Sequence, residues 1–141
     1  MKKLVLSLLL VFGVTFGVIA QPNKAATADN KQSGTQAEIT FDKLEHNYGE
    51  VQRNGNGETT FTYTNTGKTP LILSNVRSSC GCTVPSWPRE PIMPGQSAGI
   101  RVKYNTANPG PINKSVTVES NASNNRVVLR IKGKVLNSPT N

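Results

Sequence analysis

Apolar and polar side chains alternate with a period of two residues in several short runs of the chain. In the run 58–65, Phe61 and Tyr63 share one face and threonines occupy the other. That period, together with the enrichment in aromatic and β-branched residues, is typical of a half-buried β-strand. By the same pattern we predict further strands over 71–76, 100–104, 116–118 and 127–135.

Residues that favour turns separate these runs. Glycine, asparagine and proline gather at 54–57, 94–95, 108–111 and 124–125. No stretch shows a helical period of useful length, so short strands with one apolar face each predict an all-β domain. Two packed sheets, a β-sandwich, suit strands of such unequal length better than a closed barrel does. The residues expected to supply most of the core are Phe41, Phe61, Tyr63, Leu71, Leu73, Ile100, Val102, Tyr104, Val116, Val118, Leu129 and Ile131.

The N-terminus has the features of a secretory signal peptide over residues 1–20. Lys2 and Lys3 precede an apolar run at 4–19, and Ala20 supplies a small residue at the expected cleavage site. The alternative, a membrane anchor, is less favoured because the run is shorter than the roughly 18 residues that a spanning helix needs. We therefore expect a periplasmic or secreted protein with no stable membrane span after cleavage.

The rest of the chain divides by composition into three parts. Residues 21–37 contain no aromatic residue and no Val, Ile or Leu. They cannot bury enough apolar area to offset the entropy of ordering them, which predicts a flexible spacer. Residues 38–136 form one predicted domain, of a size that supports a single core, and 137–141 a disordered tail.

The formal net charge is +8. Export argues against nucleic acid as the partner, and most cations are scattered, so we attribute the charge mainly to solubility. One row stands out on the outward face of the last predicted strand. We expect this row either to contact an anionic partner or, as we favour, to protect a sheet edge from self-pairing. Its members are Arg126, Arg130, Lys132 and Lys134.

The chain has two cysteines, and they are separated by one residue, as Cys80-Gly81-Cys82. Because no third cysteine exists, each can pair only with the other, with a metal or with another molecule. Export favours a structural disulfide. Closing it requires a turn that brings the two Cα atoms within about 4.4–6.8 Å, and Gly81 permits such a turn because it lacks a Cβ.

Two chemical alternatives remain open for the same pair. A tight disulfide ring is readily exchanged, and Arg77 or Arg89 could stabilise a thiolate. Two close thiolates also suit Cu(I), with Met93 or His46 as further ligands, whereas a zinc site wants four protein ligands and the chain has too few. Disulfide formation with a partner's thiol is a further option.

Two other side chains deserve consideration as sites. Trp87 lies between prolines, and tryptophan is enriched at interaction hot spots. Trp87 and Arg89 are therefore possible partner contacts, although Trp87 could equally cap the core. His46 is the only histidine and would have to serve any Ser-His-Asp or Cys-His arrangement. A histidine beside a strand is more often a hydrogen-bonded surface residue.

Several short motifs follow one another in an order that resembles a bacterial family, the domain of unknown function 1573. They are 46–51 (HNYGEV), 61–67 (FTYTNTG), 79–84 (SCGCTV), 92–95 (IMPG) and 133–135 (GKV). The family is similar in turn to the Hydin-like and major-sperm-protein-like immunoglobulin superfold. The resemblance implies an exported, immunoglobulin-like β-sandwich of about seven antiparallel strands, and it implies no established activity.

These observations favour an exported, non-catalytic binding or structural module of the cell envelope. Its partner would be a protein or an envelope component that the sequence does not identify. The alternative function is thiol redox chemistry or Cu(I) binding at Cys80 and Cys82. No other cofactor is expected.

Overall fold

The computed structural model describes residues 36–137, in which all regular structure is β-strand. The predicted signal peptide, residues 21–35 of the predicted spacer and residues 138–141 lie outside the described residues. Within the described range, no helix exists that is long and apolar enough to cross a membrane. The strands are β1 (Ile39–Phe41), β2 (Glu45–Val51), β3 (Glu58–Asn65), β4 (Leu73–Ser78), β5 (Thr83–Ser86), β6 (Ser97–Tyr104), β7 (Gly110–Ser120) and β8 (Arg126–Val135).

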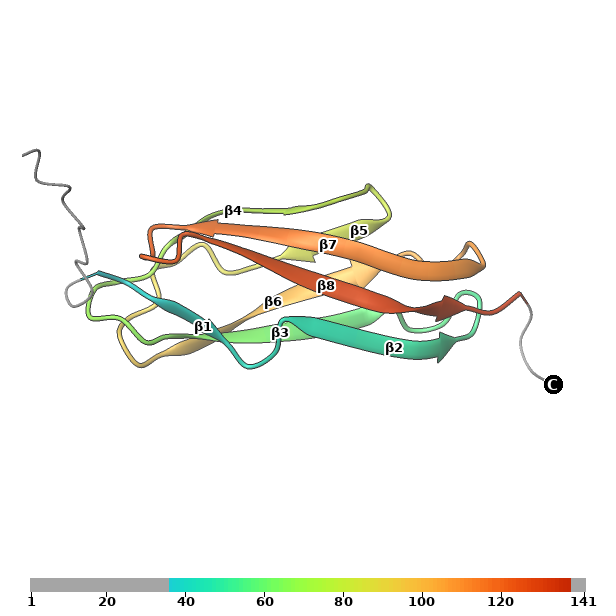
Figure 1. The fold of residues 1–141 in the computed structure, drawn as a ribbon, viewed down its shortest axis with the longest axis horizontal. Coiled ribbons are helices and arrows are strands. Elements are labelled where there is room, and N and C mark those ends of the chain that lie inside the picture. Colours follow the sequence, from blue (N-terminus) through green and yellow to red (C-terminus); the bar gives the residue numbers. More distant parts are fainter. Residues whose placement is uncertain (1–35, 138–141) are drawn as a thin grey trace, which may run out of the picture. The chain divides into compact units, whose positions relative to one another are not determined.

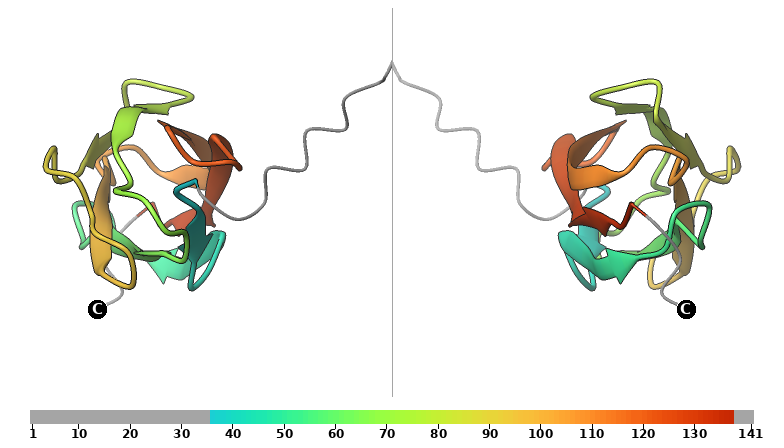
Figure 2. Two further views of the ribbon diagram at one scale, coloured as in Figure 1. Left: turned by 90° about the vertical axis from the view of Figure 1, so that its left-hand side faces the viewer. Right: turned by 90° about the vertical axis from the view of Figure 1, so that its right-hand side faces the viewer.

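The strands form two four-stranded sheets, in the orders β1-β3-β6-β5 and β2-β8-β7-β4 (Figure 1). End views show strands of the two sheets on opposite sides of the interior (Figure 2). The predicted all-β immunoglobulin-like sandwich is confirmed. Two details differ from the expectation of about seven antiparallel strands. The described residues contain eight strands, and β2 pairs with β8 in parallel.

The core lies between the sheets and is built from alternate residues of their strands. Phe61 and Tyr63 on β3 and Ile100 on β6 have no exposed surface. Each such side chain contributes about 1.5–3 kcal/mol when fully buried. All predicted core residues are buried except Phe41 and Tyr104, which pack against the core and are partly exposed. Sequence reasoning did not include Ala37, Ile39, Val76, Ile112, Ala122 and Val135 in the core.

Ordered contacts begin before the expected start of the domain at Glu38. Ala37 is buried, and its carbonyl oxygen accepts a hydrogen bond from the Ser123 N–H at 2.9 Å. The Gln36 carbonyl accepts another from the Lys68 N–H at 3.1 Å. The last two residues of the predicted spacer therefore belong to the packed structure, because a small alanine and backbone groups suffice to anchor them.

Two prolines lie inside strand segments that the sequence did not predict. β5 includes Pro85, which is compatible because β5 is an edge strand of its sheet. β7 begins at Gly110 and includes Pro111. The neighbouring β4 pairs with β7 only from Val116 onward, so the missing N–H of Pro111 interrupts no ladder on that side.

The row of cations on β8 does not protect a sheet edge. β8 lies between β2 and β7, and the edges of this sheet are β2 and β4. Edge protection was therefore the wrong interpretation. The alternating residues are exposed on the outer face of an interior strand, where Lys132 forms an ion pair with Glu45 on β2 at 2.8 Å.

Candidate functional site

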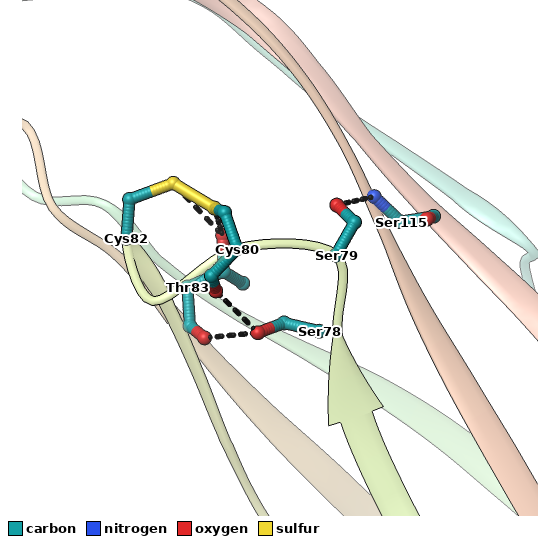
Figure 3. Close-up of a disulfide and its surroundings, with 6 residues drawn as sticks. All are labelled: Ser78, Ser79, Cys80, Cys82, Thr83 and Ser115. Atoms are coloured by element: carbon teal, nitrogen blue, oxygen red, sulfur yellow. Dashed lines mark hydrogen bonds between the residues drawn. A yellow bond between two sulfur atoms is a disulfide. The ribbon is translucent and has the colours of Figure 1, made fainter.

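Cys80 and Cys82 form a disulfide in the loop between β4 and β5 (Figure 3). This loop carries the chain from one sheet to the other. The two Cα atoms are 5.3 Å apart, within the range that a disulfide requires. The bridge therefore closes the crossover into a small ring at one end of the sandwich.

Hydrogen bonds fix the residues on both sides of this ring. The Ser78 Oγ lies 2.6 Å from the carbonyl oxygens of both Cys80 and Thr83, so its hydroxyl bridges the two ends of the loop. Ser79 and Ser115 on β7 exchange two bonds: the Ser79 N–H donates to the Ser115 carbonyl at 2.9 Å, and the Ser115 N–H donates to the Ser79 Oγ at 3.1 Å. These bonds hold the loop independently of the disulfide.

Thr83 places a buried hydroxyl beside the sulfurs. The residue is 2% exposed, and its Oγ1 lies 3.6 Å from the Cys80 Sγ and 4.0 Å from the Cys82 Sγ. Among the described residues, these sulfurs are the only hydrogen-bond partners of that hydroxyl. Neutral sulfur is a weak acceptor. Sequence reasoning missed Thr83, although its place directly after Cys82 was a usable signal.

Gly81 leaves one side of the ring open. Its φ does not lie in the left-handed region, and a Cβ built on it would meet no atom within 4 Å outside its chain neighbours Cys80 and Cys82. The turn therefore does not require a glycine. The absence of a side chain instead leaves exposed backbone next to the disulfide.

An open cavity of about 590 Å³ adjoins the ring. Cys82 lines it and Cys80 does not. Hydrogen bonds shape its walls before any ligand arrives: the Asn54 N–H donates to the Thr106 carbonyl at 3.1 Å, and the Thr106 hydroxyl donates to the Gly55 carbonyl at 2.7 Å. The lining residues come from 54–58, 81–82, Val84 and 103–107.

The structure does not bring the two proposed additional copper ligands to the sulfurs. His46 is on β2, and β8 and β7 separate it from β4. Burial, and secondarily the charge of Lys43, lowers the pKa of His46. Met93 precedes the start of β6, whereas Thr83 pairs with Tyr104 at the end of that strand. The described residues contain no group of three or more His, Cys, Asp or Glu side chains arranged to hold a metal.

Copper binding at the cysteine pair itself stays a prediction. In the disulfide, the two sulfurs are bonded to each other, and Cu(I) would require their prior reduction to thiolates.

The two arginines considered as thiolate stabilisers have other partners. Arg77 forms an ion pair with Glu119 at 2.9 Å on the outer face of the sheet. The Arg89 guanidinium lies 3.9 Å from the centre of the Trp87 ring. Neither contact directs a positive charge at the sulfurs, so Thr83 is the polar side chain that the fold places there.

Trp87 packs against the core and is partly buried. Its Nε1 is buried and has no hydrogen-bond partner among the described residues. Arg89 covers one face of the ring. The ring therefore acts as a cap on the core, and the remaining exposed part of Trp87 and Arg89 is what a partner could contact.

The family model described as "Protein of unknown function (DUF1573)" matches residues 39–135, nearly the whole described domain. The chain belongs to the DUF1573 family. Among curated proteins, none matches the chain.

Solved structures share the fold at low sequence identity. A protein of unknown function from Porphyromonas gingivalis W83 is similar at 15% identity with a TM-score of 0.63, over 72% of this chain and 48% of that chain. The PapD-like domain 7 of human CEP192 is similar at 11% identity and TM-score 0.60, over 90% and 99%. The CupB2 chaperone of Pseudomonas aeruginosa is similar at 14% identity and TM-score 0.50, over 68% and 55%. The DUF1573 chain thus spans about half the length of the first of these proteins.

Proposed function

We propose that this DUF1573 protein is an exported, non-catalytic module of the cell envelope that binds a protein partner at the cavity beside the disulfide loop. The observation that carries the proposal is the cavity itself, because its walls are preformed by hydrogen bonds among three loops. A preformed surface binds without the entropic cost of ordering its own loops.

The cavity offers groups that suit an extended polypeptide. The Oδ1 atoms of Asn56 and Asn105 accept hydrogen bonds from the backbone N–H groups of Glu58 and Ala107, both at 2.9 Å. Their Nδ2 groups remain as donors for a partner's carbonyl oxygens. Val84 on edge strand β5 is 61% exposed and adds an apolar contact. Amide donors beside an exposed valine match the alternating polar and apolar character of a peptide segment.

Export is supported by the signal-peptide pattern over residues 1–20. The structural neighbours include a protein named as a chaperone, CupB2. That likeness concerns the fold alone, so the partner class is argued from the cavity rather than from the neighbour.

Site-specific photo-crosslinking in the producing cells tests the binding proposal. A photoreactive residue is placed at Asn56 or Val84, on the cavity rim, and as the matched control at Lys68, in the turn at the opposite end of β3. We expect one protein adduct of defined mass from both rim positions and none from Lys68. No rim adduct, or equal adducts at all three positions, contradicts the proposal. Export is tested separately by the intact mass of the protein, which we expect to match a chain that starts at Gln21.

A second candidate function is thiol exchange at Cys80 and Cys82. One observation favours it: the buried Thr83 hydroxyl has the two sulfurs as its only hydrogen-bond partners among the described residues. A buried donor on a weak acceptor gains little in the disulfide form and much more when a sulfur becomes a thiolate. Equilibration of the intact protein with reduced and oxidised glutathione tests this candidate, and a disulfide that does not exchange contradicts it.

A further inference from the structure

The two cysteines of the disulfide have different surroundings. Cys82, together with Gly81, lines the open cavity, whereas Cys80 does not. Cys80 has the closer contact with the buried Thr83 hydroxyl. We propose that a partner protein's thiolate attacks Cys82, that Cys80 is the leaving thiolate, and that the Thr83 hydroxyl stabilises it. This inference rests on the thiol-exchange candidate function and assigns its residues.

In this proposal the incoming thiolate approaches Cys82 through the cavity that this residue lines. The cavity is open to solvent and has a volume of about 590 Å³, which accommodates the side chain and flanking backbone of a partner segment. Gly81 adds no side chain on the approach. The same rim carries the amide donors of Asn56 and Asn105, which can hold the backbone of the partner's cysteine segment.

The position of the Thr83 hydroxyl selects Cys80 as the leaving group. The Thr83 Oγ1 is 3.6 Å from the Cys80 Sγ and 4.0 Å from the Cys82 Sγ. A thiolate at Cys80 would accept a charge-assisted hydrogen bond from a hydroxyl that is 2% exposed, where little water competes. A leaving thiol with a lower pKa departs faster. Thr83 therefore favours cleavage of the disulfide with Cys80 as the leaving thiolate.

The loop keeps its shape when the sulfur–sulfur bond opens. Ser78 still bridges the carbonyls of Cys80 and Thr83. The Asn105 N–H still donates to the Cys82 carbonyl at 2.8 Å. These bonds hold the two cysteines near each other, so the ring recloses as an intramolecular reaction.

The exchange balances as a transfer between two dithiols. The partner's thiolate forms a bond to the Cys82 Sγ, the Cys80–Cys82 bond breaks, and its electron pair passes to the Cys80 Sγ. The partner's second thiolate then attacks the partner's first sulfur, which is bonded to Cys82 in the mixed disulfide, and Cys82 is released as a thiolate. The partner's dithiol is oxidised to a disulfide by loss of two electrons, and Cys80 and Cys82 are reduced by the same two electrons. The protons that the partner's thiols lost to solvent are matched by those that the new thiolates take up.

Single-cysteine variants test which sulfur is attacked. C80S leaves Cys82 as the only thiol, and C82S leaves Cys80. Each is reacted with dithionitrobenzoate at a pH where both thiols are ionised, so that the thiolate fractions are equal and the rates differ through accessibility and intrinsic nucleophilicity. We expect the thiol of C80S to react at least about tenfold faster than that of C82S. Equal rates, or faster reaction of C82S, overturn the assignment of Cys82.

Thr83 is tested as a positioning residue through the thiol pKa of Cys80. In the C82S background, Thr83→Val should raise that pKa by about one unit, a tenfold change in the thiolate-to-thiol ratio, as read from thiolate absorbance. Thr83→Ser should restore it. Thr59→Val, which alters a buried threonine on β3, is the matched control and should leave it unchanged. A Cys80 pKa that does not move in Thr83→Val overturns the role of Thr83.

Glutathione equilibration of the intact protein separates the two possible failures. If the disulfide does not exchange with glutathione, the thiol-exchange function itself fails. If it exchanges but the single-cysteine rates and the Cys80 pKa do not differ as stated, the function stands and the residue assignment fails.

Discussion

The side-chain amide of Asn124 binds both backbone groups of Ile39. Its Oδ1 accepts a hydrogen bond from the Ile39 N–H at 3.1 Å, and its Nδ2 donates to the Ile39 carbonyl at 2.7 Å. Ile39 lies on β1 in one sheet, and Asn124 lies in the turn between β7 and β8 of the other. The pair therefore occupies the free side of a three-residue edge strand and links the two sheets.

Replacing Asn124 with alanine should lower the free energy of unfolding by about 1–2 kcal/mol, because two backbone groups of Ile39 lose their partners. Urea denaturation measures the change. Asn125→Ala is the matched control, since that side chain is exposed and makes no side-chain hydrogen bond within residues 36–137. Equal stability of the two variants would show that the link contributes nothing.

Asn65 should be more sensitive. It is completely buried, its Nδ2 donates to the carbonyls of Thr69 and Ile92 at 2.8 and 2.9 Å, and its Oδ1 accepts from the Gly67 N–H at 3.0 Å. We expect Asn65→Ala to destabilise the protein by about 2–4 kcal/mol, because several buried backbone groups are left unsatisfied. Thermal and urea unfolding measure it. Asn113→Ala, on an exposed site of β7, should change stability little.

Replacement by alanine should lower the stability of the protein at one glycine and leave it unchanged at another. A Cβ on Gly67 would collide with backbone atoms of Gln36, Ala37 and Glu38, whereas one on Gly81 would meet nothing within 4 Å beyond the adjacent cysteines. Gly67→Ala should cost about 1–3 kcal/mol through overpacking, and Gly81→Ala should leave both the melting temperature and the disulfide intact. A large loss of stability in Gly81→Ala would contradict the open geometry of the cysteine loop.

Two tyrosines provide a second contrasting pair. The Tyr63 hydroxyl is buried with no hydrogen-bond partner among the described residues, whereas the Tyr48 hydroxyl donates to the Gly57 carbonyl at 2.7 Å. Tyr63→Phe should leave the free energy of unfolding unchanged or raise it by up to about 2 kcal/mol, since it removes a desolvated polar group. Tyr48→Phe should lower it by about 1 kcal/mol. A marked loss in Tyr63→Phe would reveal a partner for that hydroxyl.

The same tyrosines predict a loss of stability at alkaline pH. Burial raises the pKa of each from 10.0 to about 12, with a further contribution from Glu58 at Tyr48. The unfolded protein therefore releases these protons at lower pH than the folded one. Their contribution should be fully present below about pH 10 and should disappear as the pH rises toward about 12. Urea midpoints across this range, measured in the C80S/C82S double variant to avoid alkaline disulfide cleavage, should fall less steeply in Tyr48→Phe. An unchanged slope would contradict the shift at Tyr48.

The strands with a clean period of two were predictable from sequence, because burial on one face leaves a direct trace in residue type. β3 has the predicted bounds, Glu58–Asn65. β5 was not predicted, since Pro85 argues against a strand unless the strand is known to lie at a sheet edge. The burial of Ala37 and Ile112 was likewise missed, because neither residue belongs to an alternating run long enough to stand out.

The candidate site was predictable in its reactive atoms and not in its surroundings. The spacing of the cysteines indicated a disulfide. The cavity beside Cys82 depends on loops near Asn54 and Asn105, far apart in sequence, and only the fold brings them together. The motif Asn65-Thr66-Gly67 supported the family resemblance without explaining it. The structure supplies the reason, since Asn65 holds the turn and Gly67 packs against the backbone of the N-terminal segment.

The passage of the chain from β1 to β2 means that one continuous stretch supplies one edge strand of each sheet. The connection is exposed, and Leu44 within it is 54% accessible. Proteolysis at this connection would therefore detach β1 from the rest of the sandwich and uncover β3, whereas β2 would stay joined to β3 and paired with β8. Such a nicked molecule would have one vacant pairing position, beside β3, that β1 of a second copy can fill, so limited digestion should produce strand-exchanged assemblies.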